Sequence, residues 1–231
     1  MKTLLLAAAA AVFATGVSAA SITISFETDD RGFIDLPTGN TYGAAVSPTS
    51  PLPSGLPGFS VDADTFNVAS SNGTANFNLS LNGERRISIN QDIEGLGINN
   101  LNGGDSNDID GFGSNDILVF SFDRVVTLTQ AIFENFDRGD EFVFYRGPDA
   151  NPNAVNADIF SLPVPDTDGD EGFRNFAFTG TTFGIGALDG DDDFRLSKLT
   201  LHVTPVPLPA AGWMLLAGLG GLAAMRRRQR S

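Results

Sequence analysis

The sequence predicts a single all-β domain, an antiparallel β-sandwich of the jelly-roll kind, on three observations. Helix signals are nearly absent between residues 20 and 204. In their place stand roughly ten short runs of alternating apolar and polar residues, interrupted by Gly, Asn, Asp and Pro at the spacing typical of sandwiches. The chain of 231 residues also has 19 Phe, nearly all in these runs, to fill a core. No internal repeat or boundary divides residues 21–204, so we expect one domain.

Residues 1–20 have the three parts of a secretory signal peptide. Lys2 provides the positive charge, residues 4–14 form an apolar run, and Val17, Ser18 and Ala19 are small enough for cleavage. The mature chain is therefore expected to begin at Ala20 or Ser21. The lack of cysteine is compatible with export, because disulfides are permitted outside the cell but not required there.

The alternating runs predict individual strands, each with one apolar face. The segment 38–58 is predicted as a surface loop, because its four prolines cannot donate to a central sheet ladder. In chain order, the side chains expected to share a buried strand face are Ile22, Ile24 and Phe26; Ala75, Phe77, Leu79 and Leu81; Leu118, Phe120 and Phe122; Phe142 and Phe144; and Phe183, Ile185 and Ala187.

The last strand changes the parity of its apolar residues. Phe194 and Leu196 lie on one face, whereas Leu199, Leu201 and Val203 have the opposite parity. Unless both faces of this strand are buried, an extra residue must be inserted between the two sets. The sequence therefore predicts a β-bulge near residues 197–198.

The C-terminus has a second tripartite signal. A short motif is followed by the apolar stretch 211–225 and then by a basic cluster. As a helix the stretch would be about 22 Å long, short for a hydrocarbon core of roughly 30 Å, but neighbouring residues and snorkelling arginines make a transmembrane helix workable. The motif is Val206, Pro207, Leu208, Pro209 and Ala210, and the basic cluster that would keep the chain's end in the cytoplasm is Arg226, Arg227, Arg228 and Arg230.

The motif, helix and arginine cluster of residues 205–231 together resemble the VPLPA-CTERM branch of the PEP-CTERM sorting signals. This resemblance implies an exosortase that cleaves the inner-membrane-tethered precursor near the motif, and a final place in the cell envelope or outside the cell. It also implies a bacterial source that makes extracellular polysaccharide. Residues 117–122 and the closing strand with its three aspartates resemble, only diffusely, the jelly-roll ectodomains found ahead of such signals.

Charge and composition exclude several classes of function. The chain has 28 acidic and 14 basic residues, one His and no Cys. Removal of both ends leaves nine basic residues and a net charge of −19. A nucleic-acid partner would need clustered Lys and Arg, and disulfides, Cys nucleophiles and zinc sites of Cys and His are excluded by composition.

Three acidic clusters could supply the oxygen ligands that Ca²⁺ requires. The second begins like an EF-hand loop, but Glu171 and Ala177 replace the required Gly and Glu, so an EF-hand is rejected. The alternative for each cluster is an ordinary turn, because Asp, Asn and Gly are common turn residues. The candidate ligands are Asp105, Asn107, Asp108, Asp110 and Asp116; Asp166, Asp168 and Asp170; and Asp189, Asp191 and Asp193.

No arrangement of residues indicates an enzyme. His202 lies in the last strand and is expected at the surface, and the only Trp, Trp213, lies in the C-terminal apolar stretch. We therefore expect a secreted, exosortase-sorted protein of the cell envelope or extracellular matrix with a non-catalytic β-sandwich. The alternative hypothesis is a Ca²⁺-dependent carbohydrate-binding module that holds exopolysaccharide. Ca²⁺ is the only cofactor expected, and exosortase, the membrane and extracellular polysaccharide are the expected partners.

Overall fold

The structure, a computed structural model, describes residues 20–31, 33–37, 45–70, 76–83, 87–100, 107–137, 139–147, 157–161 and 172–203, with Gly220 and Arg226. Within this part of the chain, eleven strands form one antiparallel sheet. The strands are β1 (Ala20–Ser25), β2 (Phe59–Ser70), β3 (Asn76–Leu81), β4 (Ile87–Asp92), β5 (Gly95–Asn100), β6 (Ile109–Asp110), β7 (Asn115–Glu134), β8 (Glu141–Tyr145), β9 (Ala157–Ser161), β10 (Gly172–Gly186) and β11 (Asp193–Val203). The prediction of an all-β, antiparallel domain is confirmed.

Strand β7 connects the two halves of the sheet. Its first half pairs with β2, from Asn115 opposite Phe66 to Phe122 opposite Phe59. Its second half pairs with β11, from Val126 opposite Val203 to Glu134 opposite Arg195. Along its other edge β7 pairs with β10 over nearly its whole length. One strand thus holds both halves in register.

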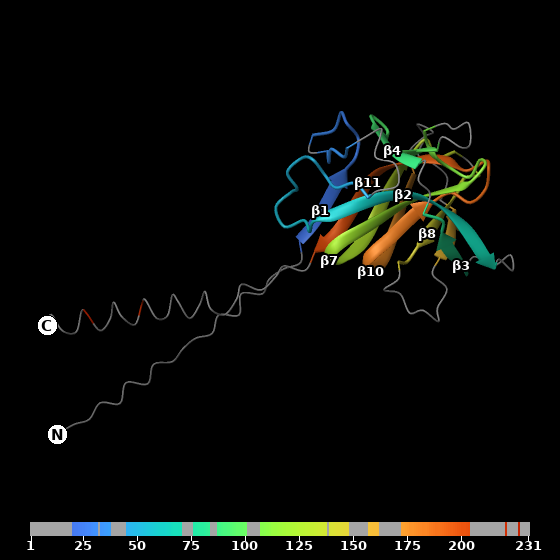
Figure 1. Cartoon of the computed structure of the whole chain (residues 1–231). Coiled ribbons are helices and arrows are strands. Elements are labelled where there is room, and N and C mark those ends of the chain that lie inside the picture. The colour runs from blue at the N-terminus through green and yellow to red at the C-terminus, as the bar shows by residue number, and fades with distance from the viewer. Residues whose placement is uncertain are drawn as a thin grey trace, which may run out of the picture. The chain divides into compact units, whose positions relative to one another are not determined.

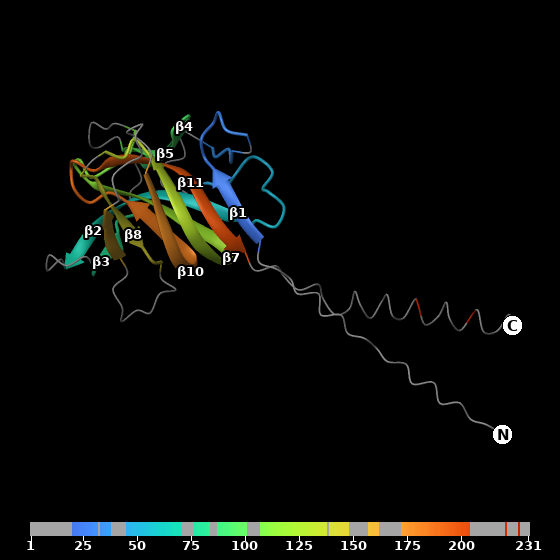
Figure 2. The ribbon, with the colours of Figure 1, turned by 180° about the vertical axis from the view of Figure 1, so that it is seen from behind.

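The strand pairings also close on themselves. Beyond β7 the chain of hydrogen-bonded neighbours runs β2, β3, β9, β8 and β10, and β10 returns to β7. On the other side, β11 pairs with β1 along residues 198–203 and contacts β5 and β6 nearer its start. Figures 1 and 2 show β1, β11, β7 and β10 side by side. Few of these strands are left with an unpaired edge, which limits edge-to-edge association.

Phenylalanine rings fill the larger of two apolar clusters. Phe133 is fully buried and has ring centroids of three other Phe around it, at 4.8 Å from Phe142, 5.5 Å from Phe194 and 5.6 Å from Phe136. The smaller cluster uses the opposite faces of β2, β7 and β8, with Phe66, Ile117, Val119, Val143 and Tyr145. Residues 117–120 of β7 and residues 142–145 of β8 are therefore buried on both faces.

Glycine at one position lets two strands approach closely. A Cβ added to Gly186 of β10 would lie 2.4 Å from the carbonyl oxygen of Asp116 and 2.9 Å from the Cβ of Ile117. Both distances are shorter than side chains tolerate, so a larger residue would force β10 away from β7. The glycine-rich end of β10 is thus required for its pairing with β7.

The predicted strand faces are confirmed for the described residues except Leu81, and Ala75 and the side chain of Phe77 lie outside the described part of the chain. Ile24 and Phe26, then Leu118, Phe120 and Phe122, then Phe142 and Phe144, and finally Phe183, Ile185 and Ala187 belong to the larger cluster. Leu79 is buried in the smaller one, but Leu81 on the same face is exposed, because it lies at the end of β3. Residues 45–58 contain no strand and only one isolated bridge, as predicted for the proline-rich loop.

The predicted bulge in β11 is confirmed. The register with β7 passes from Leu196 opposite Phe133 to Lys198 opposite Ile132, so Ser197 is the extra residue. Its hydroxyl is buried and hydrogen-bonded to the carboxylate of Glu27. The insertion turns Phe194 and Leu196, and then Leu199, Leu201 and Val203, toward the same core.

The two ends lie largely outside the described residues. Ala20–Val203 form one compact unit. The signal peptide, the motif at residues 206–210, the apolar stretch 211–225 except Gly220, and Arg227, Arg228 and Arg230 are not among the residues described. In the described part of the chain, no helix has the length and apolar character needed to cross a membrane. The transmembrane helix therefore stays a prediction.

We expect the substitution Phe133→Ala to lower the free energy of unfolding by about 3–5 kcal/mol, because it removes a fully buried ring and leaves a cavity. Phe173→Ala is the control, since that ring is 51% exposed and should change stability by no more than about 0.5 kcal/mol. Urea unfolding followed by fluorescence or circular dichroism measures both. Equal effects would contradict the position of Phe133 at the centre of the core.

Candidate functional site

Two of the three predicted acidic clusters meet in the structure. The short strand β6 pairs with the start of β11, which places Asp110 opposite Asp193 and Ile109 opposite Phe194. The turn between β7 and β8 adds Asp137 and Asp140, whose charges act on Asp193 and on each other. We call Asp108, Asp110, Asp137, Asp140, Asp192 and Asp193 the acidic junction. The pairing of β6 with β11 thus brings together two segments that lie about 80 residues apart in the sequence.

Several carboxylates of the acidic junction hold turns in place. Asp192 accepts hydrogen bonds from the amide N–H of Glu141 at 2.8 Å, of Asp189 at 2.9 Å and of Leu188 at 3.3 Å. Asp110 accepts from the amide of Phe112 at 2.9 Å. The bonds from Leu188, Asp189 and Phe112 are the local side chain–backbone bonds that make Asp a turn residue, whereas the bond from Glu141 joins residues far apart in the sequence. Asp192 thereby ties the 188–192 turn to the start of β8.

A buried arginine neutralises part of the surrounding charge. Arg195 of β11 is 4% exposed. Its Nε lies 2.8 Å from Oδ1 of Asp108, and its Nη1 lies 2.9 Å from Oδ2 of Asp92. Glu94 adds a third carboxylate at 3.4 Å. Asp108, a predicted Ca²⁺ ligand, is therefore already paired with a cation of this chain.

Three carboxylates of the acidic junction, Asp140, Asp192 and Asp193, have raised pKa values. Burial is the largest cause of the raised pKa of Asp140, which is about 7. The charges of Asp193, Asp192 and Asp137 add to this increase, and the hydrogen bond from the amide of Asp137 opposes it. The pKa of Asp193 is also raised, first by burial and then by the negative charges of Asp108, Asp137, Asp110 and Asp192. Burial also raises the pKa of Asp192, against its three amide bonds. The junction therefore favours a proton or a cation over free carboxylates.

The described geometry does not show a preformed metal site. Among the residues that the structure describes, no group of three or more His, Cys, Asp or Glu side chains is arranged to hold a metal ion. Asn107 has a left-handed backbone with φ of 74° and accepts a hydrogen bond from the Asn99 amide group. Asp116 is buried in β7 opposite Thr65. Asp191 is exposed in its turn. Asp105, Asp166, Asp168 and Asp170 lie outside the described residues.

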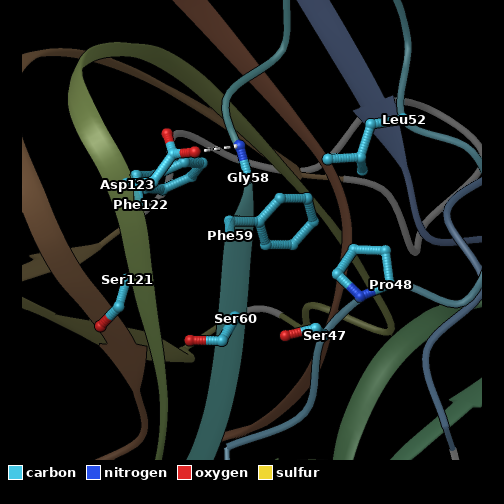
Figure 3. A pocket seen from close by; sticks show the side chains of 9 residues that line it. All are labelled: Ser47, Pro48, Leu52, Gly58, Phe59, Ser60, Ser121, Phe122 and Asp123. Carbon is cyan, nitrogen blue, oxygen red and sulfur yellow. Dashed lines mark hydrogen bonds between the residues drawn. The ribbon is translucent and has the colours of Figure 1, made fainter.

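A separate hollow lies between the proline-rich loop and the paired strands β2 and β7. Its volume is about 480 Å³, and it is lined by Ser47, Pro48, Leu52, Gly58, Phe59, Ser60, Ser121, Phe122 and Asp123. Figure 3 shows the Phe59 ring pointing toward Pro48 and Leu52, while Asp123 accepts a hydrogen bond from the Gly58 amide at 3.1 Å. Ser60 and Ser121 lie opposite each other on the two strands.

The polar groups that line the hollow are three serines and one carboxylate. Its three serines have no His or Lys beside them in the lining, and its one carboxylate already holds the Gly58 amide. A serine nucleophile needs an adjacent base to become reactive. His202, the only histidine of the chain, is exposed on β11, as the sequence predicted.

Sequence reasoning missed Asp137, Asp140 and Arg195 as members of the acidic junction. Asp137 and Asp140 stand in no acidic run of the sequence, and nothing next to Arg195 marks it as a charge partner. The parity change in β11 is the one available signal, because it places the bulge two residues after Arg195. The direction in which Arg195 points, however, depends on the β4–β5 hairpin that carries Asp92 and Glu94.

Comparison of this chain with protein-family models, with curated proteins and with solved structures finds no match.

The raised pKa of Asp140 predicts that stability falls as pH rises. Because the folded-state pKa of about 7 exceeds the ordinary aspartate value of 3.8, the folded protein holds this proton more tightly than the unfolded chain does. Its contribution is fully present below about pH 4 and is lost as pH rises through 7. We expect Asp140→Asn to abolish roughly 1–4 kcal/mol of the difference in unfolding free energy between pH 5 and pH 8.

The control for this measurement is Asp191→Asn, an exposed residue of the neighbouring turn. Urea unfolding at pH 5 and pH 8 measures the free energy of unfolding of the unmodified protein and of the two variants. A pH dependence that survives unchanged in Asp140→Asn would show that this carboxyl is ionised normally in the folded protein.

Proposed function

We propose that this chain is an exported protein of the bacterial cell envelope or extracellular matrix, sorted by an exosortase, with a non-catalytic β domain. The observation that carries the proposal is the order of its parts: a signal peptide at residues 1–20, a domain, and the tripartite signal of residues 205–231. Export and sorting signals act at the chain's ends, so the domain between them needs only to fold and to bind.

The domain boundaries support this reading. The described sheet begins at Ala20 and ends at Val203, and these two residues are paired partners in β1 and β11. Cleavage after residue 19 would therefore leave β1 intact, and cleavage near residues 206–210 would leave β11 intact. Both processing steps would act outside the strands of the described sheet.

We further propose that the sheet folds into a sandwich of the jelly-roll kind. In support, side chains from β1, β2, β7, β8, β10 and β11 contribute to one apolar cluster, as expected when two sheet faces pack together. Strand β7 would then pass from one layer toward the other at residues 123–125, between its pairings with β2 and β11.

Calcium belongs to the proposal as a stabilising ion at the acidic junction. Asp108 and Asp192 are already engaged by Arg195 and by backbone amides. Asp140 and Asp193 are the carboxylates that would gain most from a cation, because burial and the neighbouring carboxylates, Asp110 and Asp137 among them, raise the pKa values of these two groups. Hard carboxylate oxygens suit Ca²⁺. Such an ion would join the 137–140 turn to β6 and β11.

The processing step can be tested with matched proline variants. We expect Pro207→Ala with Pro209→Ala to leave the precursor unprocessed in the inner membrane, because the motif would no longer be recognised. The sequence offers a control with the same Pro-Leu-Pro order, Pro51 and Pro53 in the exposed loop. Mass spectrometry of protein from membranes, envelope and medium measures processing. Normal external product from the first variant would contradict exosortase sorting.

The calcium step can be tested by thermal unfolding. Millimolar Ca²⁺ should raise the melting temperature more than NaCl of equal ionic strength does, since a bound ion stabilises by about 2.7 kcal/mol at a hundred times its Kd. Asp110→Asn with Asp193→Asn should remove the Ca²⁺-specific part, and Asp29→Asn, at an exposed turn, should retain it. If NaCl raises the melting temperature as much as Ca²⁺, the acidic clusters are ordinary turns.

A further inference from the structure

One side of the sheet carries no acidic residue over four adjacent strands. Strands β1 and β10 contain neither Asp nor Glu, β11 has none after Asp193, and β7 has none between residues 124 and 133. The chain as a whole has 28 acidic residues. The strands β1, β11, β7 and β10, which Figure 2 shows side by side, therefore form a neutral face on a strongly acidic domain.

The outward side chains of this face carry hydroxyl and amide groups. Four of them form a row that crosses the strands. Thr23 lies opposite Thr200, Thr200 opposite Gln130, and Gln130 opposite Asn175. The hydroxyls of Thr23 and Thr200 are 3.1 Å apart, and Nε2 of Gln130 donates to Oδ1 of Asn175 at 3.3 Å. With strands about 4.8 Å apart, the row spans roughly 14 Å.

A second row lies one step along the strands. His202 is opposite Thr127, and Thr127 is opposite Thr179, with the two threonine hydroxyls 2.9 Å apart. We call Thr23, Thr127, Gln130, Asn175, Thr179 and Thr200 the hydroxyl face. Hydrogen bonds between exposed neighbours fix these side chains, so less rotamer freedom is lost when a ligand binds.

The charge nearest to the hydroxyl face is already compensated. Lys198 of β11 lies 3.0 Å from a carboxylate oxygen of Glu27 and 3.9 Å from one of Asp30. The other titratable group on these outward positions is His202. Arg174 of β10, next to Asn175, lies with its guanidinium carbon 4.5 Å from the centroid of the Phe160 ring. A ligand that covers the face therefore meets Lys198 as an ion pair and Arg174 engaged with an aromatic ring.

We propose that the hydroxyl face binds an uncharged polysaccharide chain. Removing water from ionised carboxylates costs far more than removing it from hydroxyls and amides. In a domain with a net charge of −19, the face without carboxylates is where a hydroxyl-rich polymer can replace bound water at least cost. Hydroxyls and amides both donate and accept hydrogen bonds, which matches sugar hydroxyls.

An exposed aromatic ring completes the binding surface. Phe173 of β10 is 51% exposed and lies two residues from Asn175 on the same outward side of the strand. Its opposite residue on β7 is Ile132. An apolar ring at the end of a polar row gives the C–H face of a sugar ring a surface to pack against. A second copy of this chain fits less well, because two such faces would bury polar groups against each other and bring together two acidic domains.

This inference rests on the proposed non-catalytic role of the domain but not on sorting. Binding is measured on purified processed protein by native electrophoresis in gels that contain hydroxyethyl cellulose or dextran as uncharged probes, or alginate as a charged one. We expect retardation by at least one uncharged polymer and none by alginate. Release of reducing ends from a bound polymer would refute the non-catalytic role while leaving binding intact, so the two failures are distinguishable.

The face is tested by Thr127→Val with Thr200→Val, which keeps side-chain shape and strand preference but removes two hydroxyls. We expect the dissociation constant to rise about tenfold, and Phe173→Ala to weaken binding as well. The matched control is Ser60→Ala with Ser121→Ala, a cross-strand hydroxyl pair in the hollow. Thermal unfolding confirms that all variants are folded.

Three outcomes would overturn the proposal: no retardation by either uncharged polymer, loss of binding in the serine control with normal binding by the threonine variant, or stronger retardation by alginate. A concentration-dependent dimer in sedimentation that the threonine variant abolishes would assign the face to self-association instead.

Discussion

The continuous pairing of β7 is the constraint on which the rest of the structure depends. This strand is paired along both edges, to β10 on one side and to β2 and then β11 on the other. Successive side chains of β7 point to opposite faces of the sheet. Where both faces are covered, both must therefore be apolar, and residues 117–120 are apolar and buried. A shift of one residue in β7 would exchange the two apolar clusters and misplace every neighbouring strand.

Acidic residues in this domain act first as parts of turns. Asp64 accepts hydrogen bonds from the amides of Thr65 and Gly83, Asp123 from Gly58, and Asp192 from three amides. Arg195 draws three further carboxylates around one buried cation. A strongly negative chain can therefore fold because many of its carboxylates are bound to backbone amides or to Arg195, and the acidic junction is where this compensation is incomplete.

The distribution of charge divides the surface into two kinds. The end of the sheet near β6 concentrates carboxylates whose ionisation is unfavourable, whereas the outward side of β1, β11, β7 and β10 has hydroxyls and amides. The acidic junction favours a cation or a proton, and the hydroxyl face favours a neutral polymer that forms hydrogen bonds.

The sequence by itself determined the class of fold, the strands and their buried faces, and the bulge at Ser197, because alternation and its interruption are local properties of the chain. It also predicts a signal at each end, which rests on sequence pattern alone. Only the tertiary structure decided that Asp110 meets Asp193, that Asp108 pairs with Arg195, and that Thr200 and Gln130 share a row. These contacts depend on which strands become neighbours, and antiparallel pairing over long sequence separations follows from packing of the whole core and not from any local pattern.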